Sequence, residues 1–467
     1  LKAAGVEISG QEIDLVEQVW GEERPAMPKA ALRAHPTKYA GETVADKLKR
    51  IRTAMRETDA GALAVGALDE IAWALNLRGA DVDFNPVFIS FLLVEEKKAR
   101  LFVDTSKLSE ELKASLPADL SLEDYPRFGQ ALARLGAEGR AVWMDPQTHN
   151  QHSRQEVIKA GGRILADPSP ISAWKAIKNQ AELEGFRAAH HRDALAMVKF
   201  LRWLETAVPA GELTELSAAA RLGEFRAEAP EYIGPSFETI SGYGPHGAIV
   251  HYRVNAESDI PLKTEGIYLV DSGGQYEDGT TDITRTMALG TPTAMHKKAY
   301  TAVLRGHLQL FRSLFPEGTD GYQLDVLARA PVWAAGLNYG HGTGHGVGAA
   351  LCVHEGPFSV SPRKNMTALA AGHVLSIEPG YYKTDDFGMR IENLAVVVEV
   401  EQNESGNFLG FKPLTLCPYE RQLIDKKMLN PTEIEQINDY HKTVLDVLSE
   451  ELDEAHRAWL TQACRPL

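Results

Sequence analysis

Two aspartates, Asp271 and Asp282, are the first residues in the sequence whose type and spacing suggest chemistry. Asp271 ends the apolar segment YLVD and Asp282 lies in TTDITRT, with Gly273, Gly274 and Gly279 between them. This pattern predicts two strands joined by a turn, each of which brings one carboxylate to the same place. A hard metal cation takes such oxygen ligands. An ordinary hairpin with a polar turn explains the pair alone equally well.

A glycine-rich segment farther along the chain, YGHGTGHGVGAALCVHEGP, contains His341, His345 and His354. No Gly-Lys-Ser/Thr ending follows the glycines, so a nucleotide-binding loop is disfavoured. Glycine lets the backbone approach a crowded centre closely, and we therefore expect His345 to reach a metal. A single histidine on a loop is usually a surface residue, but three within fourteen positions require another explanation.

Two more carboxylates follow this segment. VLSIEPGYY predicts an apolar strand that ends at Glu378, just before a turn. FGMRIENLAVVV predicts one continuous strand that places Arg390, Glu392 and Leu394 on the same face. Burial of a carboxylate and a guanidinium costs free energy unless each is paired or binds an ion. A structural Arg–Glu ion pair is the alternative to a metal site.

Together these patterns suggest a single ligand set. Its members are Asp271, Asp282, His345, Glu378 and Glu392. Four carboxylates brought together without a cation would repel one another by an energy on the order of several kcal/mol. Two divalent ions would compensate this repulsion, and one imidazole with four carboxylates suits Mn²⁺ better than a thiolate-type zinc site. Two such ions about 3.5–4 Å apart would make water more acidic and polarise a substrate carbonyl.

The elements that must position these residues are expected to form two α/β domains. Residues 1–45 are polar and contain three prolines, which predicts a linker or an arm on the surface. Helical and strand patterns alternate over residues 46–174, as expected for a first α/β domain. Residues 175–467 predict a second domain, with a C-terminal helical extension from about residue 417.

Local signals define the order of elements in the second domain. Asn179 and Glu182 form a capping-box pattern at the start of a long helix. Strand patterns follow, among them GAIVHYRV, which contains His251, then a helix pair and further strands. This order predicts two α/β halves that face each other across a site. A second capping-box pattern, Thr432 and Glu435, predicts the start of the last helix.

Composition excludes several classes of protein. The formal net charge of -15 and the lack of a basic stripe argue against a nucleic-acid-binding protein. No apolar run approaches the roughly 20 residues that a membrane span requires. The three cysteines are too few for a disulfide scaffold, which favours a reducing compartment.

The motifs resemble those of the pita-bread metallopeptidases, the family of methionine aminopeptidase, prolidase and aminopeptidase P. The similar segments are DSGGQYEDGTTDITRT, HGTGHGVG, VHEGP, IEPGYY and RIEN, together with ALDEIAWALNLRGADVDFNPVF in the first domain. The residues of these motifs are most similar to those of the cytosolic eukaryotic-type X-Pro aminopeptidases. The resemblance implies a creatinase-like α/β domain followed by a pita-bread catalytic domain with pseudo-two-fold halves, the second and third of three domains.

The resemblance also implies a role for each site residue. The five-residue ligand set named above would bind two metals, with Asp282 and Glu392 bridging them. Glu378 would also move a proton between water and the leaving nitrogen. His251 and His354 would hydrogen-bond the substrate carbonyl and the tetrahedral intermediate. Arg390 would hold Asp282 or Glu378 in place. The residues expected to contact the substrate are His251, His345, His354 and Arg390.

The activity implied is removal of the N-terminal residue from peptides with proline in the second position. Two alternatives remain at this point: a prolidase that cleaves X-Pro dipeptides, and a pita-bread protein that binds a partner without catalysis. The resemblance further implies two divalent ions, a homodimer and a cytoplasmic location.

Overall fold

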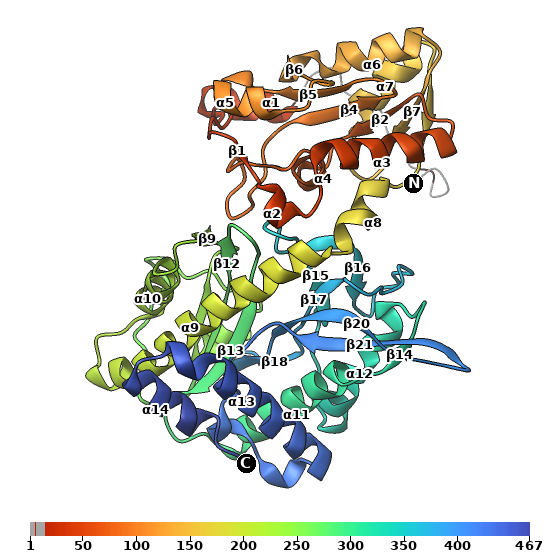
Figure 1. Cartoon of the computed structure of the whole chain (residues 1–467). Coiled ribbons are helices and arrows are strands. Elements are labelled where there is room, and N and C mark those ends of the chain that lie inside the picture. The colour runs from red at the N-terminus through yellow and green to blue at the C-terminus, as the bar shows by residue number, and fades with distance from the viewer. Residues whose placement is uncertain (1–4, 6–14) are drawn as a thin grey trace.

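The computed structural model describes residue 5 and residues 15–467, which form two α/β bodies (Figure 1). The first body contains a six-stranded sheet in the order β6-β5-β4-β2-β7-β8. Its strands are β2 (Ala62–Val65), β4 (Phe91–Glu95), β5 (Ala99–Val103), β6 (Leu120–Asp124), β7 (Ala141–Met144) and β8 (Arg163–Leu165).

Helices cover both faces of this sheet (Figure 1). Buried side chains of α6 and α7 pack with Leu93 and Val142 on one face, and those of α3 and α4 pack with Leu63 and Leu92 on the other. The helices of this domain are α3 (Val44–Glu57), α4 (Leu68–Ala74), α5 (Glu110–Ser115), α6 (Phe128–Ala137), α7 (Gln151–Lys159) and α8 (Pro170–Ala176). Because both faces are covered, the strands have few polar residues.

Part of the segment expected to be a surface arm belongs to this domain. Residues 1–4 and 6–14 lie outside the described residues, and α1 (Leu15–Trp20) has no buried residue. However, β1 (Arg33–Ala34) pairs with β3 (Leu77–Arg78), and α2 (Thr37–Ala40) follows it. The Leu32 and His35 side chains are buried. The interpretation of residues 32–40 as an arm is therefore wrong. They pack on the first domain, where the Leu32 side chain is part of the apolar core and Ala40 is buried.

Helix α4 ends at Ala74. Asn76 adopts a positive φ of 47°, a conformation that asparagine tolerates better than most residues, and the chain then enters β3. The Asn76 side chain accepts a hydrogen bond from the Lys47 ammonium, 2.8 Å away, which holds this turn in place.

The second body begins with α9 (Gln180–Ala210), whose predicted capping box of Asn179 and Glu182 is confirmed. A three-stranded sheet, β10-β11-β13, and a six-stranded sheet, β14-β21-β20-β17-β15-β16, form its two halves. Each half has a helix pair, α9 with α10 and α11 with α12, so the expected α/β class with two halves is confirmed. The helices not yet bounded are α10 (Glu215–Ala227), α11 (Ala294–Phe311) and α12 (Gly321–Ala334).

The strands of the second domain fall into these two sheets and two small pairs, β9 with β12 and β18 with β19. Those of the first half are β9 (Tyr232–Pro235), β10 (Ile240–Tyr243), β11 (Ile267–Ser272), β12 (Gly274–Tyr276) and β13 (Ile283–Ala288). Those of the second half are β14 (Phe315–Pro316), β15 (Gly344–Gly346), β16 (Glu355–Val360), β17 (Val374–Ile377), β18 (Gly380–Lys383), β19 (Phe387–Arg390), β20 (Asn393–Asn403) and β21 (Gly406–Pro413).

Two predicted strands differ in the structure. Only the first two residues of GAIVHYRV belong to a 3-10 helix, η5 (Gly244–Ala248), and the rest form a turn and a loop that carries His251. FGMRIENLAVVV forms two strands: β19 pairs with β18, whereas β20 pairs with β17 and β21. The chain changes sheets at Ile391 and Glu392, and the periodicity of an apolar run does not reveal such a change.

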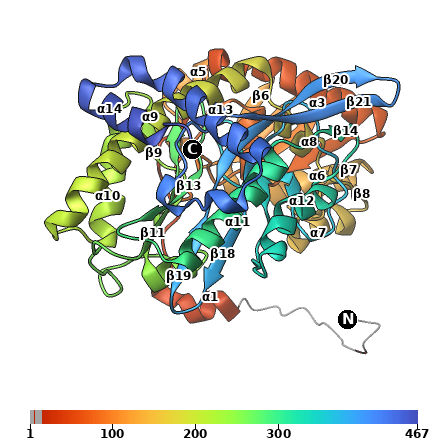
Figure 2. The ribbon, with the colours of Figure 1, turned by 90° about the horizontal axis from the view of Figure 1, so that it is seen from below.

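The C-terminal helices α13 (Pro431–Leu448) and α14 (Glu454–Ala463) lie over α9 and α11 (Figure 2). The cap of α13 is Asn430 with Glu433, not the predicted Thr432 and Glu435. Pro431 occupies the first helical position, where its missing N–H costs nothing, and this fixes the start of the helix. Among residues 15–467, we find no helix with the length and apolar character needed to cross a bilayer.

Buried ion pairs connect the two bodies. The Lys175 ammonium lies 2.8 Å from Asp69 Oδ2 in the first domain and 2.8 Å from Glu355 Oε2 in the second. Arg78 donates to the carbonyls of Ala349 and Ala350. These contacts place the first domain over one side of the site described next.

Candidate metal centre

The five predicted ligands come from the facing edges of the two halves. Asp271 lies in β11 and Asp282 immediately precedes β13, which pairs with β11 so that Asp271 is opposite Thr284. His345 is the middle residue of β15, and Glu378 directly follows β17. Glu392 lies in the break between β19 and β20. The structure thus places the predicted residues around one position.

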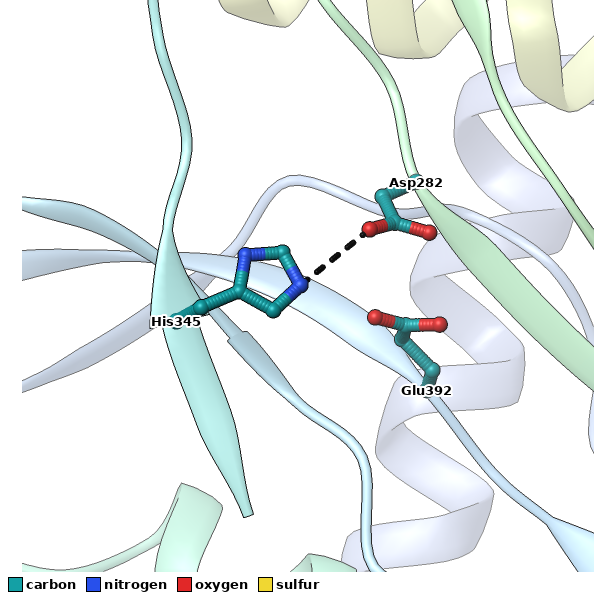
Figure 3. Close-up of side chains that lie close together, drawn as sticks. All are labelled: Asp282, His345 and Glu392. Carbon is teal, nitrogen blue, oxygen red and sulfur yellow. Dashed lines mark ion pairs between the residues drawn. The ribbon is translucent and has the colours of Figure 1, made fainter. Parts of the chain in front are cut away.

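Asp282, His345 and Glu392 point toward one another (Figure 3). Each offers one ligand atom, and these atoms all lie within 4.8 Å of one another. His345 Nε2 is 3.4 Å from Asp282 Oδ2 and 3.7 Å from Glu378 Oε1. The other ring nitrogen, Nδ1, is 3.0 Å from the Gly346 carbonyl and donates to it in the tautomer that fits this contact. That tautomer leaves the Nε2 lone pair free to bind a metal.

The unpaired atoms of the cluster test whether a cation fits. Asp271 Oδ1 and Asp282 Oδ1 are buried, and neither has a hydrogen-bond partner among the described residues. A buried carboxylate oxygen without a partner is costly unless it binds an ion. The donor set of one imidazole and four carboxylates therefore fits divalent cations that prefer oxygen ligands.

The electrostatics of the cluster agree with this test. Burial, followed by repulsion from Asp271 and Glu378, raises the pKa of Asp282 well above its usual value. Burial, followed by repulsion from Asp282 and Asp271, raises the pKa of Glu392 in the same way. The pKa of Glu378 is also raised, mainly by burial. Three carboxyl groups whose negative charge is disfavoured in the folded chain would be stabilised in the ionised form by bound cations.

Arg390 contacts a different ligand from the one expected. Its Nη2 donates to Asp271 Oδ2 at 2.6 Å, its Nε donates to Thr284 Oγ1, and its Nη1 donates to the Tyr382 hydroxyl. The prediction that Arg390 holds Asp282 or Glu378 is therefore wrong. The Arg390 side chain thus extends from the end of β19 to Asp271 in β11.

The Arg–Glu ion pair that was the alternative to a metal site is not formed in the described part of the chain. Glu392 Oε2 instead accepts a hydrogen bond from Thr284 Oγ1 at 2.8 Å. Sequence reasoning missed both Thr284 and Tyr382. Thr284 is two positions after Asp282 on a predicted strand, so alternation alone was a signal that it faces the same side. The tyrosine pair after Glu378 carried no comparable signal.

His251 and His354 line the cavity that contains the cluster. The His354 ring is 4.3 Å from the His345 ring, centroid to centroid, in an edge-on arrangement. Burial lowers the pKa of His354 to about 4, with smaller contributions from His345 and His251, so the imidazole is neutral at pH 7. His251 is exposed to the cavity from the loop after η5. Both histidines face the space that a substrate bound at the cluster would occupy.

The cavity has a volume of about 1390 Å³ and extends from the cluster to the first domain. Glu70, Asp145 and Ser169 line it on the first-domain side, and the exposed Arg363 and Lys364 line it on the second-domain side. A space of this size accommodates several residues of a peptide.

We expect Glu70→Gln to stabilise the protein at neutral and higher pH. Burial raises the pKa of Glu70 from 4.5 to about 7. A raised folded-state pKa gives a stabilising contribution that is complete below about pH 4.5 and is lost as the pH rises through about 7. Glutamine is neutral throughout, so the variant should gain on the order of 1–3 kcal/mol in unfolding free energy at about pH 8 and almost nothing at about pH 4.5.

Urea denaturation at the two pH values measures this difference. Glu111→Gln, at an exposed position of α5, is the matched control and should change stability little at either pH. An equal gain for Glu70→Gln at both pH values would contradict the electrostatic explanation and point to better packing of the amide.

Comparison with known protein families gives matches along the described chain. The model of metallopeptidase family M24 matches residues 184–399, that of the creatinase/prolidase N-terminal domain matches residues 23–182, and that of the C-terminal region of peptidase M24 matches residues 407–467.

Curated relatives and a solved structure match almost the whole chain. Aminopeptidase P2 of Arabidopsis thaliana is 42% identical in an alignment 489 positions long, which covers 97% of this chain and 69% of the relative. Xaa-Pro aminopeptidase 1 of Dictyostelium discoideum is 42% identical over 96% of this chain and 72% of the relative. The X-prolyl aminopeptidase of Caenorhabditis elegans, described as a cytosolic enzyme with a di-nuclear active site, superimposes with a TM-score of 0.94 at 34% identity, covering all of this chain and 77% of that one.

Proposed function

The chain belongs to metallopeptidase family M24, and from this premise we propose that it is an Xaa-Pro aminopeptidase that removes the N-terminal residue from peptides with proline in the second position. The observation that carries the proposal is the convergence of Asp271, Asp282, His345, Glu378 and Glu392 at one end of a peptide-sized cavity. The names of the two relatives and of the similar solved structure support the same activity.

These five residues would hold two divalent metal ions, with Asp282 and Glu392 shared between them. Bound ions of this kind make water more acidic and polarise a carbonyl oxygen. Arg390 would hold Asp271 by its 2.6 Å ion pair and so keep the second Asp271 oxygen directed at the centre. We assign Mn²⁺ as the metal from the oxygen-rich ligand set, and metal analysis of the purified protein tests that assignment.

Glu378 would transfer the proton that the reaction requires. The scissile bond joins the first residue to proline, so the leaving nitrogen is part of a ring and has no hydrogen of its own. It must receive a proton before it can leave. Glu378 has a raised pKa and faces the cavity, so its carboxylate can accept a proton from the attacking water and pass it to the ring nitrogen.

Two histidines would stabilise the carbonyl oxygen as it gains negative charge. His251 and His354 line the cavity beside the cluster, and a neutral imidazole donates one hydrogen bond. His345 and Arg390 complete the set that we propose lies against the substrate. The free α-amino group of the substrate would lie near the carboxylates, which explains removal of a single residue.

The comparison of X-Pro-Y tripeptides with X-Pro dipeptides tests the proposed activity. An aminopeptidase of this kind should cleave the tripeptides with a higher kcat/KM. Preference for the dipeptides would favour a prolidase, and two ions per chain without cleavage of either substrate would favour a non-catalytic binding protein. All five ligand residues are present, which argues against that last alternative.

A homodimer and a cytosolic location complete the proposal. Tyr322, Val326 and Trp333 on α12 are each more than two-fifths exposed and lie on one face of the helix, as expected of a surface that another copy covers. Light scattering of the purified protein distinguishes one chain from two. The similar cytosolic C. elegans enzyme supports the location.

A further inference from the structure

Glu215, the first residue of α10, lies outside the metal cluster but is connected to it through a loop. Its side chain is fully buried. Its Oε1 accepts a hydrogen bond from the Tyr243 amide at 2.7 Å, and its Oε2 accepts from His246 Nδ1 at 2.9 Å and from the Tyr252 hydroxyl at 3.1 Å. All three donors belong to residues 243–252, the loop that carries His251.

Burial raises the pKa of Glu215, and the hydrogen bonds from Tyr243, His246 and Tyr252 oppose this shift. Burial of a carboxylate is costly unless several donors compensate it, and here three converge on the two oxygens. A carboxylate in the first turn of a helix is also favoured by the helix dipole. The rings of His246 and Tyr252 stack on each other with centroids 4.5 Å apart, so the two donors support one another.

The opposite side of the same loop is held by β19. Gly247 lies against Gly388, where a Cβ would overlap the Gly247 carbonyl oxygen, so only glycine permits this approach. β19 ends at Arg390, the residue that pairs with Asp271. The loop is therefore fixed between α10 and a strand that leads into the metal cluster.

His251 depends on this loop for its position. In the part of the chain that the structure describes, no hydrogen bond or ion pair holds the His251 side chain itself. Its neighbour Tyr252 is bound to Glu215, and Tyr243 is bound at the other end of the loop. Loss of either hydrogen bond to Glu215 would let the loop move and shift the His251 imidazole relative to the substrate carbonyl.

We propose that Glu215 is a positioning residue for His251: its buried carboxylate fixes both ends of the 243–252 loop and thereby places the imidazole at the substrate carbonyl. This inference rests on the proposed role of His251 in X-Pro hydrolysis. A positioning role differs from a merely structural one in its kinetics: substitution of Glu215 should lower kcat only when His251 is present.

A double-mutant cycle tests this requirement. Removal of one oxyanion donor costs about 10²–10³ in kcat, so we expect His251→Ala to fall in that range. Glu215→Ala should lower kcat by roughly tenfold to a hundredfold with little change in KM, because it displaces the same donor. In the His251→Ala background, Glu215→Ala should cost less than about threefold, since the imidazole is already absent.

Conservative and milder variants keep the test decisive if the alanine variant folds poorly. Glu215→Gln retains an acceptor for the Tyr243 amide and should restore kcat to within about fivefold of the wild type. Tyr252→Phe removes a single donor and should lower kcat several-fold, an effect that should also disappear in the His251→Ala background. Glu433→Ala is the matched control: Glu433 is a buried carboxylate in the first turn of α13, and its loss should lower the melting temperature but not kcat.

The possible failures are distinguishable. If Glu215→Ala lowers kcat by the same factor with and without His251, Glu215 acts on the fold in general and the positioning role is overturned. If His251→Ala leaves kcat unchanged, the role of His251 is wrong and the inference that depends on it is overturned as well, whereas cleavage of X-Pro-Y peptides would still stand. Metal content, measured for every variant, must equal that of the wild type.

Discussion

Glu378→Gln should lower kcat for X-Pro-Y hydrolysis by at least about a thousandfold while the protein remains folded. The amide has the shape of the carboxylate but cannot accept a proton from water and return it to the ring nitrogen. Because Glu378 is a member of a group of carboxyls that burial and mutual repulsion destabilise, its neutral replacement should not lower the melting temperature of the metal-free protein.

Steady-state kinetics, circular dichroism and metal analysis together check this expectation. Glu238→Gln is the matched control, because Glu238 lines the same cavity but pairs with Arg253 away from the cluster. It should keep kcat within a few-fold of the wild type. Retention of more than a few per cent of activity by Glu378→Gln would remove Glu378 from the proton-transfer role.

Asp282→Asn should abolish metal binding and activity together. Asp282 is the ligand that we propose both ions share, and its Oδ2 is 3.4 Å from His345 Nε2. An amide offers one weaker oxygen in place of two charged ones, so both ions should be lost rather than one. In the metal-free state, however, the variant should be more stable than the wild type by on the order of 1–3 kcal/mol, because one of the mutually repelling charges is gone.

Plasma mass spectrometry gives the metal content, and thermal unfolding with and without added Mn²⁺ gives the stability. The wild type should gain stability with metal concentration, since the ion binds the folded chain preferentially, and the variant should not. Asp278→Asn, at a buried aspartate that pairs with Arg192 away from the cluster, is the control and should keep both ions. A variant at Asp282 that retains one ion per chain would contradict its assignment as the shared ligand.

Several features of the fold were predictable because their causes are local. The capping box of Asn179 and Glu182 lies within one turn of helix, and the apolar run before Asp271 lies within one strand. For the last helix, the local pattern predicted the helix itself but not its exact first residue. The predicted cap was Thr432 with Glu435, but Pro431 occupies the first helical position and the cap is Asn430 with Glu433.

The break at Ile391 and Glu392 explains the main error about the site. Side-chain alternation predicts which residues share a face only while the strand keeps one set of partners. Here β19 pairs with β18 and β20 pairs with β17, and this change of partners is set by residues far away in the sequence. Arg390 consequently lies beside Asp271, and Glu392 accepts from Thr284 instead of pairing with Arg390.

Residue type and local periodicity are properties of the chain, so the α/β class and the chemical types of the five proposed ligands could be predicted from the sequence. The folded structure was needed to show which of these residues meet, that Arg390 binds Asp271, and that Glu215 holds the loop of His251. Those contacts join residues that are far apart in sequence, and their geometry depends on strand pairing and helix packing, which no short segment encodes.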